Sequence, residues 1–147
     1  MTSTILILLD EISVRQEVIE YSLELAKRME SSLILLLLLA YGTDEIAKIE
    51  NGNTKDFNTA IKDKILSYME KIHTEGIKVE AEVRVGDPSS ELLKFLAKIG
   101  SIETIVWGGK NNVSNTKETH KKSHWLHKIR SLVKCPIVFP IEEYKNN

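Results

Sequence analysis

The sequence predicts an α/β fold in which a five-stranded parallel sheet lies between helices on both faces. Residues 5–9 and 33–39 are unbroken aliphatic runs that lack the alternation of a half-exposed strand. A strand with apolar side chains on both sides is typical of the inner part of a parallel sheet that is covered on both faces. Segments with helical periodicity follow the strands, and this strict alternation indicates a doubly wound sheet with right-handed crossovers.

The composition limits the classes of protein to which this chain can belong. Its 147 residues fit one domain, 1–147, and the net charge of −1 disfavours binding to nucleic acid through bulk charge. The one cysteine, Cys135, cannot form an internal disulfide and is interpreted as an inert, buried thiol. The apolar run 33–40 is much shorter than the roughly 20 residues of a membrane helix, and the start of the chain lacks the basic region of a signal peptide. We therefore expect a cytoplasmic domain that binds neither nucleic acid nor membrane.

A carboxylate stands between the first predicted strand and the first predicted helix. The strand at 4–9 ends at Asp10, and Ser13 with Gln16 fits a capping box that starts the following helix. In open parallel sheets, ligands bind outside the carboxyl ends of the strands, at the point where the strand order reverses. If the first strand lies at this reversal, Asp10 stands at the mouth of the crevice.

The middle of the chain predicts a second strand–helix unit and an edge strand. The strand at 33–39 is followed by a polar connector, 43–55, and by a helix over about 56–74. In the segment 78–85, valine and alanine alternate with glutamate and arginine, so one side contacts the core and the other meets water. This pattern suits the edge of the sheet.

The last two units continue the alternation. Asp87 is expected to cap a helix with Pro88 at its first position, and the short strand 104–107 then ends on a double glycine. A polar loop leads to a helix capped by Ser123, and the last strand is 137–139.

Three pairs of segments carry a likeness to a known family. They are Ile5-Leu-Ile-Leu-Leu-Asp10 with the helical stretch 19–28, Gly76-Ile-Lys-Val79 with Val85-Gly-Asp-Pro88, and Ile105-Val-Trp-Gly108 with Cys135-Pro-Ile-Val-Phe139. On these segments, the whole chain resembles the universal stress protein family. The resemblance implies the strand order 3-2-1-4-5, which sets the first and fourth strands side by side. It also makes Asp10 face Gly108 and puts the alternating third strand at an edge.

Part of this family binds an adenine nucleotide such as ATP, with or without Mg²⁺, in that crevice. The family's motif is Gly-x-x-Gly, a spacer, and then Gly-Ser or Gly-Thr. Here Gly108 matches the first glycine, Asn111 falls on the second, and Ser123-His124 falls on the final pair. Asparagine tolerates a positive φ better than other non-glycine residues, whereas a positive φ at Ser123 costs about 1–2 kcal/mol.

The resemblance therefore implies a nucleotide site between the first and fourth strands. Asp10 either contacts the ribose or bonds to loop amides, and Gly108 with Gly109 either admits a phosphate or only permits a tight exit turn. Trp107 and Trp125 are interpreted as core residues, with Trp107 close enough to wall the pocket. The expected site residues are Leu9, Asp10, Ala40, Trp107, Gly108, Gly109, Asn111, Ser123 and His124.

The segment 110–134 is rich in basic side chains and histidine. Its lysines and arginine stand against one acid, Glu118, so the segment is either an anion site beside a helix N-terminus or a solvated basic face. His120, His124 and His127 have the spacing of one helix face and form a candidate zinc or copper site. Because the adjacent lysines repel a cation, we expect no bound metal and keep the three histidines as the alternative.

We expect the protein to bind its ligand rather than convert it, with a role in stress response implied by the resemblance. The sequence contains no nucleophile–base pair, metal-hydrolase motif or Walker loop, so slow ATP hydrolysis is the most that we expect. The resemblance also implies a homodimer through the last strand, Ile137, Val138 and Phe139, where Pro140 removes a hydrogen-bond donor and shortens the pairing. The alternative is a dimeric interaction or regulatory module of the same family that has lost nucleotide binding.

Overall fold

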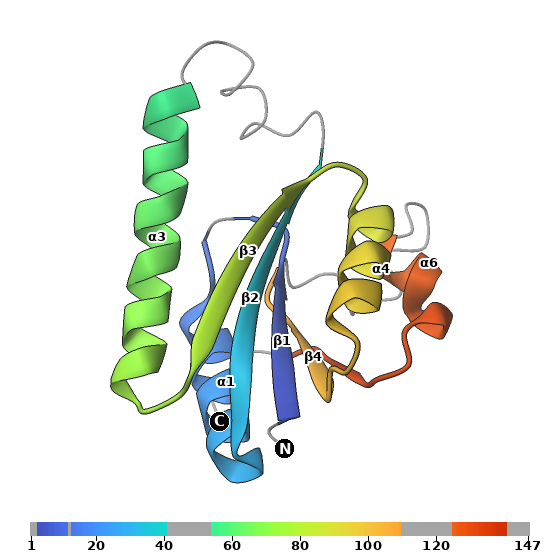
Figure 1. The fold of residues 1–147 in the computed structure, drawn as a ribbon, viewed down its shortest axis with the longest axis horizontal. Helices are drawn as coiled ribbons and strands as arrows, with labels where there is room; N and C mark the ends of the chain where they lie inside the picture. Colours follow the sequence, from blue (N-terminus) through green and yellow to red (C-terminus); the bar gives the residue numbers. More distant parts are fainter. Residues whose placement is uncertain (1–2, 12, 41–53, 110–124, 141–147) are drawn as a thin grey trace, which may run out of the picture.

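The computed structural model describes residues 3–11, 13–40, 54–109 and 125–140. These residues form a five-stranded parallel sheet in the order β3-β2-β1-β4-β5, so the predicted fold class and strand order are confirmed. Figure 1 shows helices on both faces of this sheet. In chain order, the elements are β1 (Ser3–Leu9), α1 (Gln16–Met29), β2 (Ser31–Leu39), α3 (Thr54–Thr74), β3 (Val79–Val85), α4 (Pro88–Ile99), β4 (Thr104–Trp107), α6 (Trp125–Ile129), the 3-10 turn η2 (Arg130–Leu132) and β5 (Ile137–Val138).

β1 lies at the centre of the sheet, and its unbroken apolar run is buried on both faces. Ile5, Ile7 and Leu9 pack with residues of α1 and α3, whereas Leu6 and Leu8 pack with residues of α4 and α6. All five side chains are at most 2% exposed. β2 and β4 pair with β1 on its two sides, and helices cover both faces, so no side chain of this run meets water. This burial explains why the sequence shows no alternation here.

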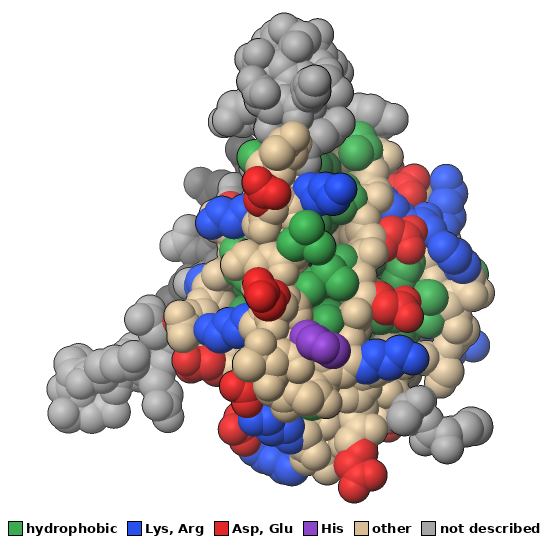
Figure 2. Space-filling view, turned by 60° about the vertical axis from the view of Figure 1, so that its left-hand side comes forward, with side chains coloured by type: hydrophobic (Ala, Val, Ile, Leu, Met, Phe, Trp, Pro, Cys, Tyr) green, Lys and Arg blue, Asp and Glu red, His purple; other side chains and the backbone are tan. Residues whose placement is uncertain are grey.

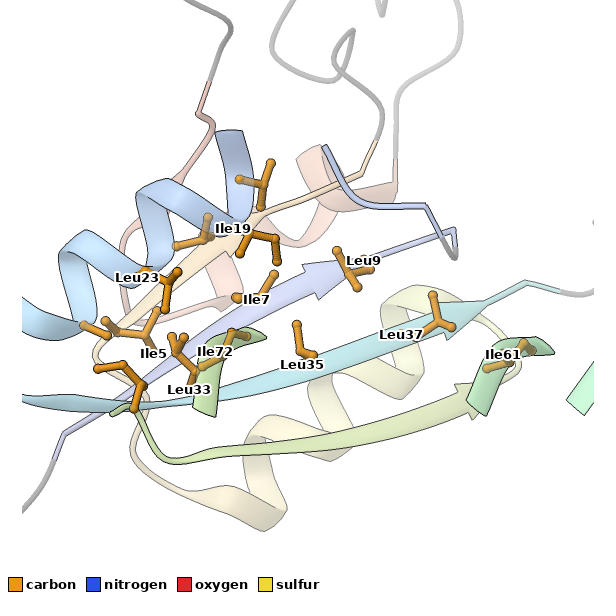
Figure 3. Close-up of a cluster of buried hydrophobic side chains, with 14 of the residues drawn as sticks. Ile5, Ile7, Leu9, Ile19, Leu23, Leu33, Leu35, Leu37, Ile61 and Ile72 are labelled. Carbon is orange, nitrogen blue, oxygen red and sulfur yellow. The ribbon is translucent and has the colours of Figure 1, made fainter. Parts of the chain in front are cut away.

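Figure 3 shows the cluster of side chains between the sheet and the helices α1 and α3. Side chains of β1 and β2 pack against Ile19 and Leu23 of α1 and against Ile61 and Ile72 of α3. Burial of one such aliphatic side chain contributes about 1.5–3 kcal/mol. The cluster thus holds β1 firmly between its neighbours and determines where Asp10 leaves the sheet.

The capping box predicted at Ser13 and Gln16 is wrong. α1 begins at Gln16, with Arg15 as its N-cap residue and without a side-chain cap. Ser13 therefore lies ahead of the N-cap, where its hydroxyl cannot cap the first turn. The backbone N–H of Val14 donates to the hydroxyl of Tyr68 in α3 at 3.0 Å. A tertiary contact thus holds the segment in which the sequence suggested a local one.

The start of α4 agrees with the sequence. The carboxylate of Asp87 accepts hydrogen bonds from the backbone N–H and the hydroxyl of Ser90, at 3.0 and 2.9 Å. These hydrogen bonds lower the pKa of Asp87. Pro88 is the first helical residue, and α4 ends at Ile99. Gly100 is its C-cap residue, with a positive φ of 91° that glycine tolerates.

The last helix and the last strand are shorter than predicted. α6 ends at Ile129 and passes into the 3-10 turn η2, and the expected cap at Ser123 lies outside the described residues. β5 contains only Ile137 and Val138, so Phe139 is not part of the strand. Pro140 has no N–H to extend the ladder. Within the described ranges, no helix is both long enough and apolar enough to span a membrane.

Candidate functional site

The carboxyl ends of β1 and β4 lie side by side at the reversal of the strand order. β1 leads through β2 to one edge of the sheet, and β4 leads to the other edge. Leu8 pairs with Trp107, and the N–H of Gly108 donates to the carbonyl oxygen of Leu8 at 2.8 Å. The ladder thus extends one residue past β4, and Asp10 and Gly109 leave the sheet next to each other. This is the position at which doubly wound sheets bind ligands.

Gly109 lies between the carboxylate of Asp10 and the indole of Trp107. A Cβ atom at Gly109 would stand 2.5 Å from Asp10 Oδ1 and 2.8 Å from Trp107 Cε2. Real Cβ contacts essentially never fall below 3.0 Å, so another residue at this position would displace the ring or the carboxylate. Glycine is therefore needed here for lack of space. We call the place where Asp10 meets the double glycine, at the carboxyl ends of β1 and β4, the notch.

Gly108 is likewise needed for close packing. A Cβ atom at this position would stand 2.5 Å from Leu9 Cδ2 and 3.2 Å from Val18 Cγ1. Neither glycine of the pair has a φ in the left-handed region. The two glycines are thus explained by close packing rather than by a tight turn. Because they have no side chains, the end of β4 can approach β1 and α1.

Trp107 is a core residue, as the sequence suggested. It is 1% exposed and packs in the cluster on the α4 and α6 side of the sheet. Its ring and that of Trp125 meet edge to face, with centroids 5.9 Å apart and an interplanar angle of 72°. This aromatic pair ties the start of α6 to the end of β4, directly beside the notch.

The remaining described residues of the predicted site differ in exposure. Leu9 is buried in the core under α1, whereas Asp10 and Ala40 are partly exposed. Ala40 follows β2 at the same carboxyl edge of the sheet. The structure thus brings Asp10, Gly108 and Gly109 together, with Ala40 one strand away.

Arg15 is a residue of this edge that the sequence analysis did not single out. Its Nη1 donates to the carbonyl oxygen of Pro140 at 3.3 Å, which joins the start of α1 to the chain after β5. Its Nε is buried and has no hydrogen-bond partner among the described residues. The contact thus joins the segments that follow β1 and β5, the two strands on either side of β4. The signal in the sequence was a lone arginine in the turn after the first strand.

Several predicted site residues lie outside the described residues, and these are Asn111, Ser123 and His124, together with His120 of the alternative metal site. His127 is partly buried in α6. Within the described part of the chain, no group of three histidine, cysteine or acidic side chains is arranged to hold a metal.

The described basic residues of the segment after residue 124, namely Lys128, Arg130 and Lys134, are exposed. Cys135 is partly buried, and desolvation raises the pKa of its thiol, which disfavours the reactive thiolate.

The sequence profile of the universal stress protein family matches residues 1–112, which is more than half of the chain. The chain belongs to the universal stress protein family. The matched range contains every strand from β1 to β4 and the double glycine after β4. A search of curated protein sequences finds no match.

Solved structures of universal stress proteins share this fold. UspA from Lactobacillus plantarum has a TM-score of 0.69 and 14% identity, over 95% of this chain and 97% of that one. The Archaeoglobus fulgidus protein in complex with dAMP has a TM-score of 0.55 and 20% identity, over 93% and 96%. A family protein from Arabidopsis thaliana with AMP bound has a TM-score of 0.51 and 18% identity, over 98% and 94%.

Proposed function

We propose that this universal stress protein binds an adenine nucleotide in the notch between β1 and β4. The observation that carries the proposal is the adjacency of Asp10 and Gly109 at the reversal of the strand order. The solved relatives from A. fulgidus and A. thaliana, described with dAMP and AMP, support it. The ligand is AMP or ATP, with Mg²⁺ where a triphosphate is bound, and the protein holds the nucleotide without converting it.

Each residue of the notch has a role that its chemistry suits. The Asp10 carboxylate is partly exposed and accepts hydrogen bonds from the ribose hydroxyls. The nucleotide lies against the backbone at the end of β4, beside Gly108 and Gly109. Arg15 contributes positive charge toward the phosphate. Asn111, Ser123 and His124 complete the proposed site from the segment after β4.

Thermal unfolding with and without nucleotide tests this proposal. At 100 times the dissociation constant, a ligand that binds only the folded state stabilises it by about 2.7 kcal/mol. For a chain of this size, we expect AMP or ATP to raise the unfolding midpoint by about 5–10 °C, and inorganic phosphate at the same concentration to raise it far less. No shift at millimolar nucleotide would favour the alternative function, a dimeric interaction or regulatory module of this family with an empty notch.

The proposal includes a homodimer through the last strand, in a cytoplasmic protein whose single domain spans 1–147. β5 is the edge strand next to β4, which suits pairing with a second copy through Ile137, Val138 and Phe139. Because β5 has only two residues and Pro140 follows, this pairing is short. We expect Ile137→Lys to lower the molecular mass that sedimentation equilibrium measures in solution. Lys134→Ala is the control and should leave this mass unchanged. An unchanged mass would contradict this contact.

A further inference from the structure

The opposite edge of the sheet, β3, is long and regular, and its side chains on the α3 face are apolar. β3 spans seven residues and contains neither lysine nor proline, which natural proteins use to protect exposed edges. Val83 and Val85 of β3 are 40% and 41% exposed, and Leu66 of the neighbouring α3 is 49% exposed. An edge of this kind pairs readily with another strand. β5, at the other edge, has only two residues.

The hydrogen-bonding groups of β3 that point outward follow from its pairing with β2. The carbonyl oxygen of Lys78 accepts from the N–H of Leu33 at 2.9 Å, and the N–H of Gly86 donates to Leu39 at 3.0 Å. In a strand, successive residues direct these groups to opposite sides, so the even-numbered residues face β2. The N–H and carbonyl groups of the odd-numbered residues therefore point to the open edge. These residues are Val79, Ala81, Val83 and Val85.

A groove lies along this edge, between α3 and β3. It has a volume of about 330 Å³. Figure 2 shows a strip of hydrophobic side chains on this side of the molecule, with acidic and basic side chains along its border. The residues that line the groove are Ile61, Lys62, Ile65, Leu66, Ala81, Glu82 and Val83.

The charges of β3 lie on the face of the sheet opposite α3. Arg84 bonds to Glu82 at 2.7 Å and to Glu91 of α4 at 3.3 Å, and its guanidinium lies over the ring of Phe95 at 5.5 Å. Lys98 of α4 is 3.6 Å from Glu82. These contacts hold one acid and one base in fixed positions, two residues apart along the edge.

Within Val79–Val85, one antiparallel register sets opposite charges against each other without also opposing like charges. If Val83 lies on a two-fold axis, Glu82 stands opposite Arg84 of the second copy, twice over. An axis at Ala81 would instead set Glu80 against Glu82, and an axis at Glu82 or at Arg84 would set a charge against its own copy. Opposite charges that face each other across two strands stabilise the pair, and like charges destabilise it.

We propose that β3 pairs antiparallel with β3 of a second copy of this chain, with Val83 on the two-fold axis. The outward N–H and carbonyl groups of Val83 then bond to those of its copy, and Ala81 pairs with Val85. An axis perpendicular to the sheet keeps both α3 helices on one face, where they cover Leu66 and the exposed valines. This contact is separate from the proposed dimer through β5 and does not involve the nucleotide notch.

Cysteine cross-linking tests the contact and its register. Val83→Cys and Val85→Cys are a matched pair, because the two side chains are almost equally exposed, and each is made with Cys135→Ser. On the axis, the Cα atoms of residue 83 and its copy are about 5.5 Å apart, which a disulfide can bridge. Residue 85 and its copy are four positions out of register, about 14 Å apart. Under mild oxidation of the full chain, we expect a covalent dimer with Val83→Cys and none with Val85→Cys.

Charge reversal tests the predicted pairs. In the Val83→Cys background, Glu82→Arg alone and Arg84→Glu alone each set like charges opposite each other, and we expect cross-linking to fall about tenfold. A mixture of the two variants restores both opposite-charge pairs and should cross-link as a heterodimer. Glu80→Arg is the control, because residue 80 faces Gly86 in this register.

Circular dichroism tests whether each variant folds. If Arg84→Glu does not fold, the comparison of cross-linking between Glu82→Arg and Glu80→Arg still tests the proposed charge pairs. Equal cross-linking of Val83→Cys and Val85→Cys would overturn the proposal, because it would indicate random collision. No cross-linking of either variant would overturn it as well. Cross-linking of Val83→Cys to a different protein would show that another partner occupies the edge, and would also contradict a second copy.

Discussion

Gly109→Ala is expected to destabilise the protein by about 1–3 kcal/mol, the cost of inserting a methyl group into a packed region. The new Cβ atom would meet the indole of Trp107 and the carboxylate of Asp10 at distances that real contacts do not reach. Because the chain has only two tryptophans, and Trp107 packs against Trp125, displacement of the ring should also change the fluorescence emission. Denaturant unfolding followed by tryptophan fluorescence measures both effects.

Two further variants separate this steric effect from a general glycine effect. A Cβ atom at Gly100 meets nothing within 4 Å, so Gly100→Ala carries only the cost of its left-handed φ and should leave the emission unchanged. In a Trp107→Leu background, Gly109→Ala should cost less than in the wild type, because the ring is gone. Equal costs in the two backgrounds would show that Trp107 is not the reason for a glycine at residue 109.

Asp10→Ala is expected to weaken the binding of AMP by about 10–150-fold. The substitution removes hydrogen bonds between a carboxylate and the ribose hydroxyls, and such bonds contribute about 1.5–3 kcal/mol. Isothermal titration calorimetry gives the affinity directly. The fold should persist, because the Asp10 side chain is partly exposed and follows the buried run of β1 rather than belonging to it.

Asp87→Ala is the matched control for this variant. Asp87 is also a carboxylate that follows a strand at the same edge of the sheet, but β3 is separated from the notch by β2. It should reduce stability through loss of the α4 cap while leaving the affinity for AMP unchanged. If Asp10→Ala bound AMP as tightly as the wild type, Asp10 would serve only to bond to the backbone of its own loop.

The sheet was predictable from the sequence because the burial of each strand determines its pattern of apolar and polar residues. The runs at 5–9 and 33–39 lack alternation because β1 and β2 are covered on both faces, and 78–85 alternates because β3 is an edge. The strand order came from the family resemblance rather than from these patterns. Together, the two sources were sufficient to bring Asp10 and Gly108 to the same end of neighbouring strands.

Features that depend on tertiary contacts were not predictable from local patterns. The capping box at Ser13 failed because the Tyr68 hydroxyl, far along the chain, binds the backbone just before α1. The need for glycine at residue 109 arises from the ring of Trp107, and the sequence does not show which way that ring points. Arg15 joins the start of α1 to the chain after β5 through a hydrogen bond to Pro140, a residue that is remote in sequence.

The roles of Asn111, Ser123 and His124 stay predictions, since they follow from the alignment of a glycine motif and lie outside the described residues. Of that motif, the structure describes the first position, Gly108, and gives it a packing reason. Contact with Leu9 and Val18 accounts for a glycine at residue 108, and its proposed binding role rests on its position at the end of β4.

A crystal structure of the protein grown with AMP tests the central claim most directly. We expect the nucleotide between β1 and β4, with ribose oxygens about 2.6–3.2 Å from the Asp10 carboxylate and the phosphate beyond Gly109. AMP bound elsewhere on the molecule, or a notch without nucleotide at saturating AMP, would contradict the proposed site.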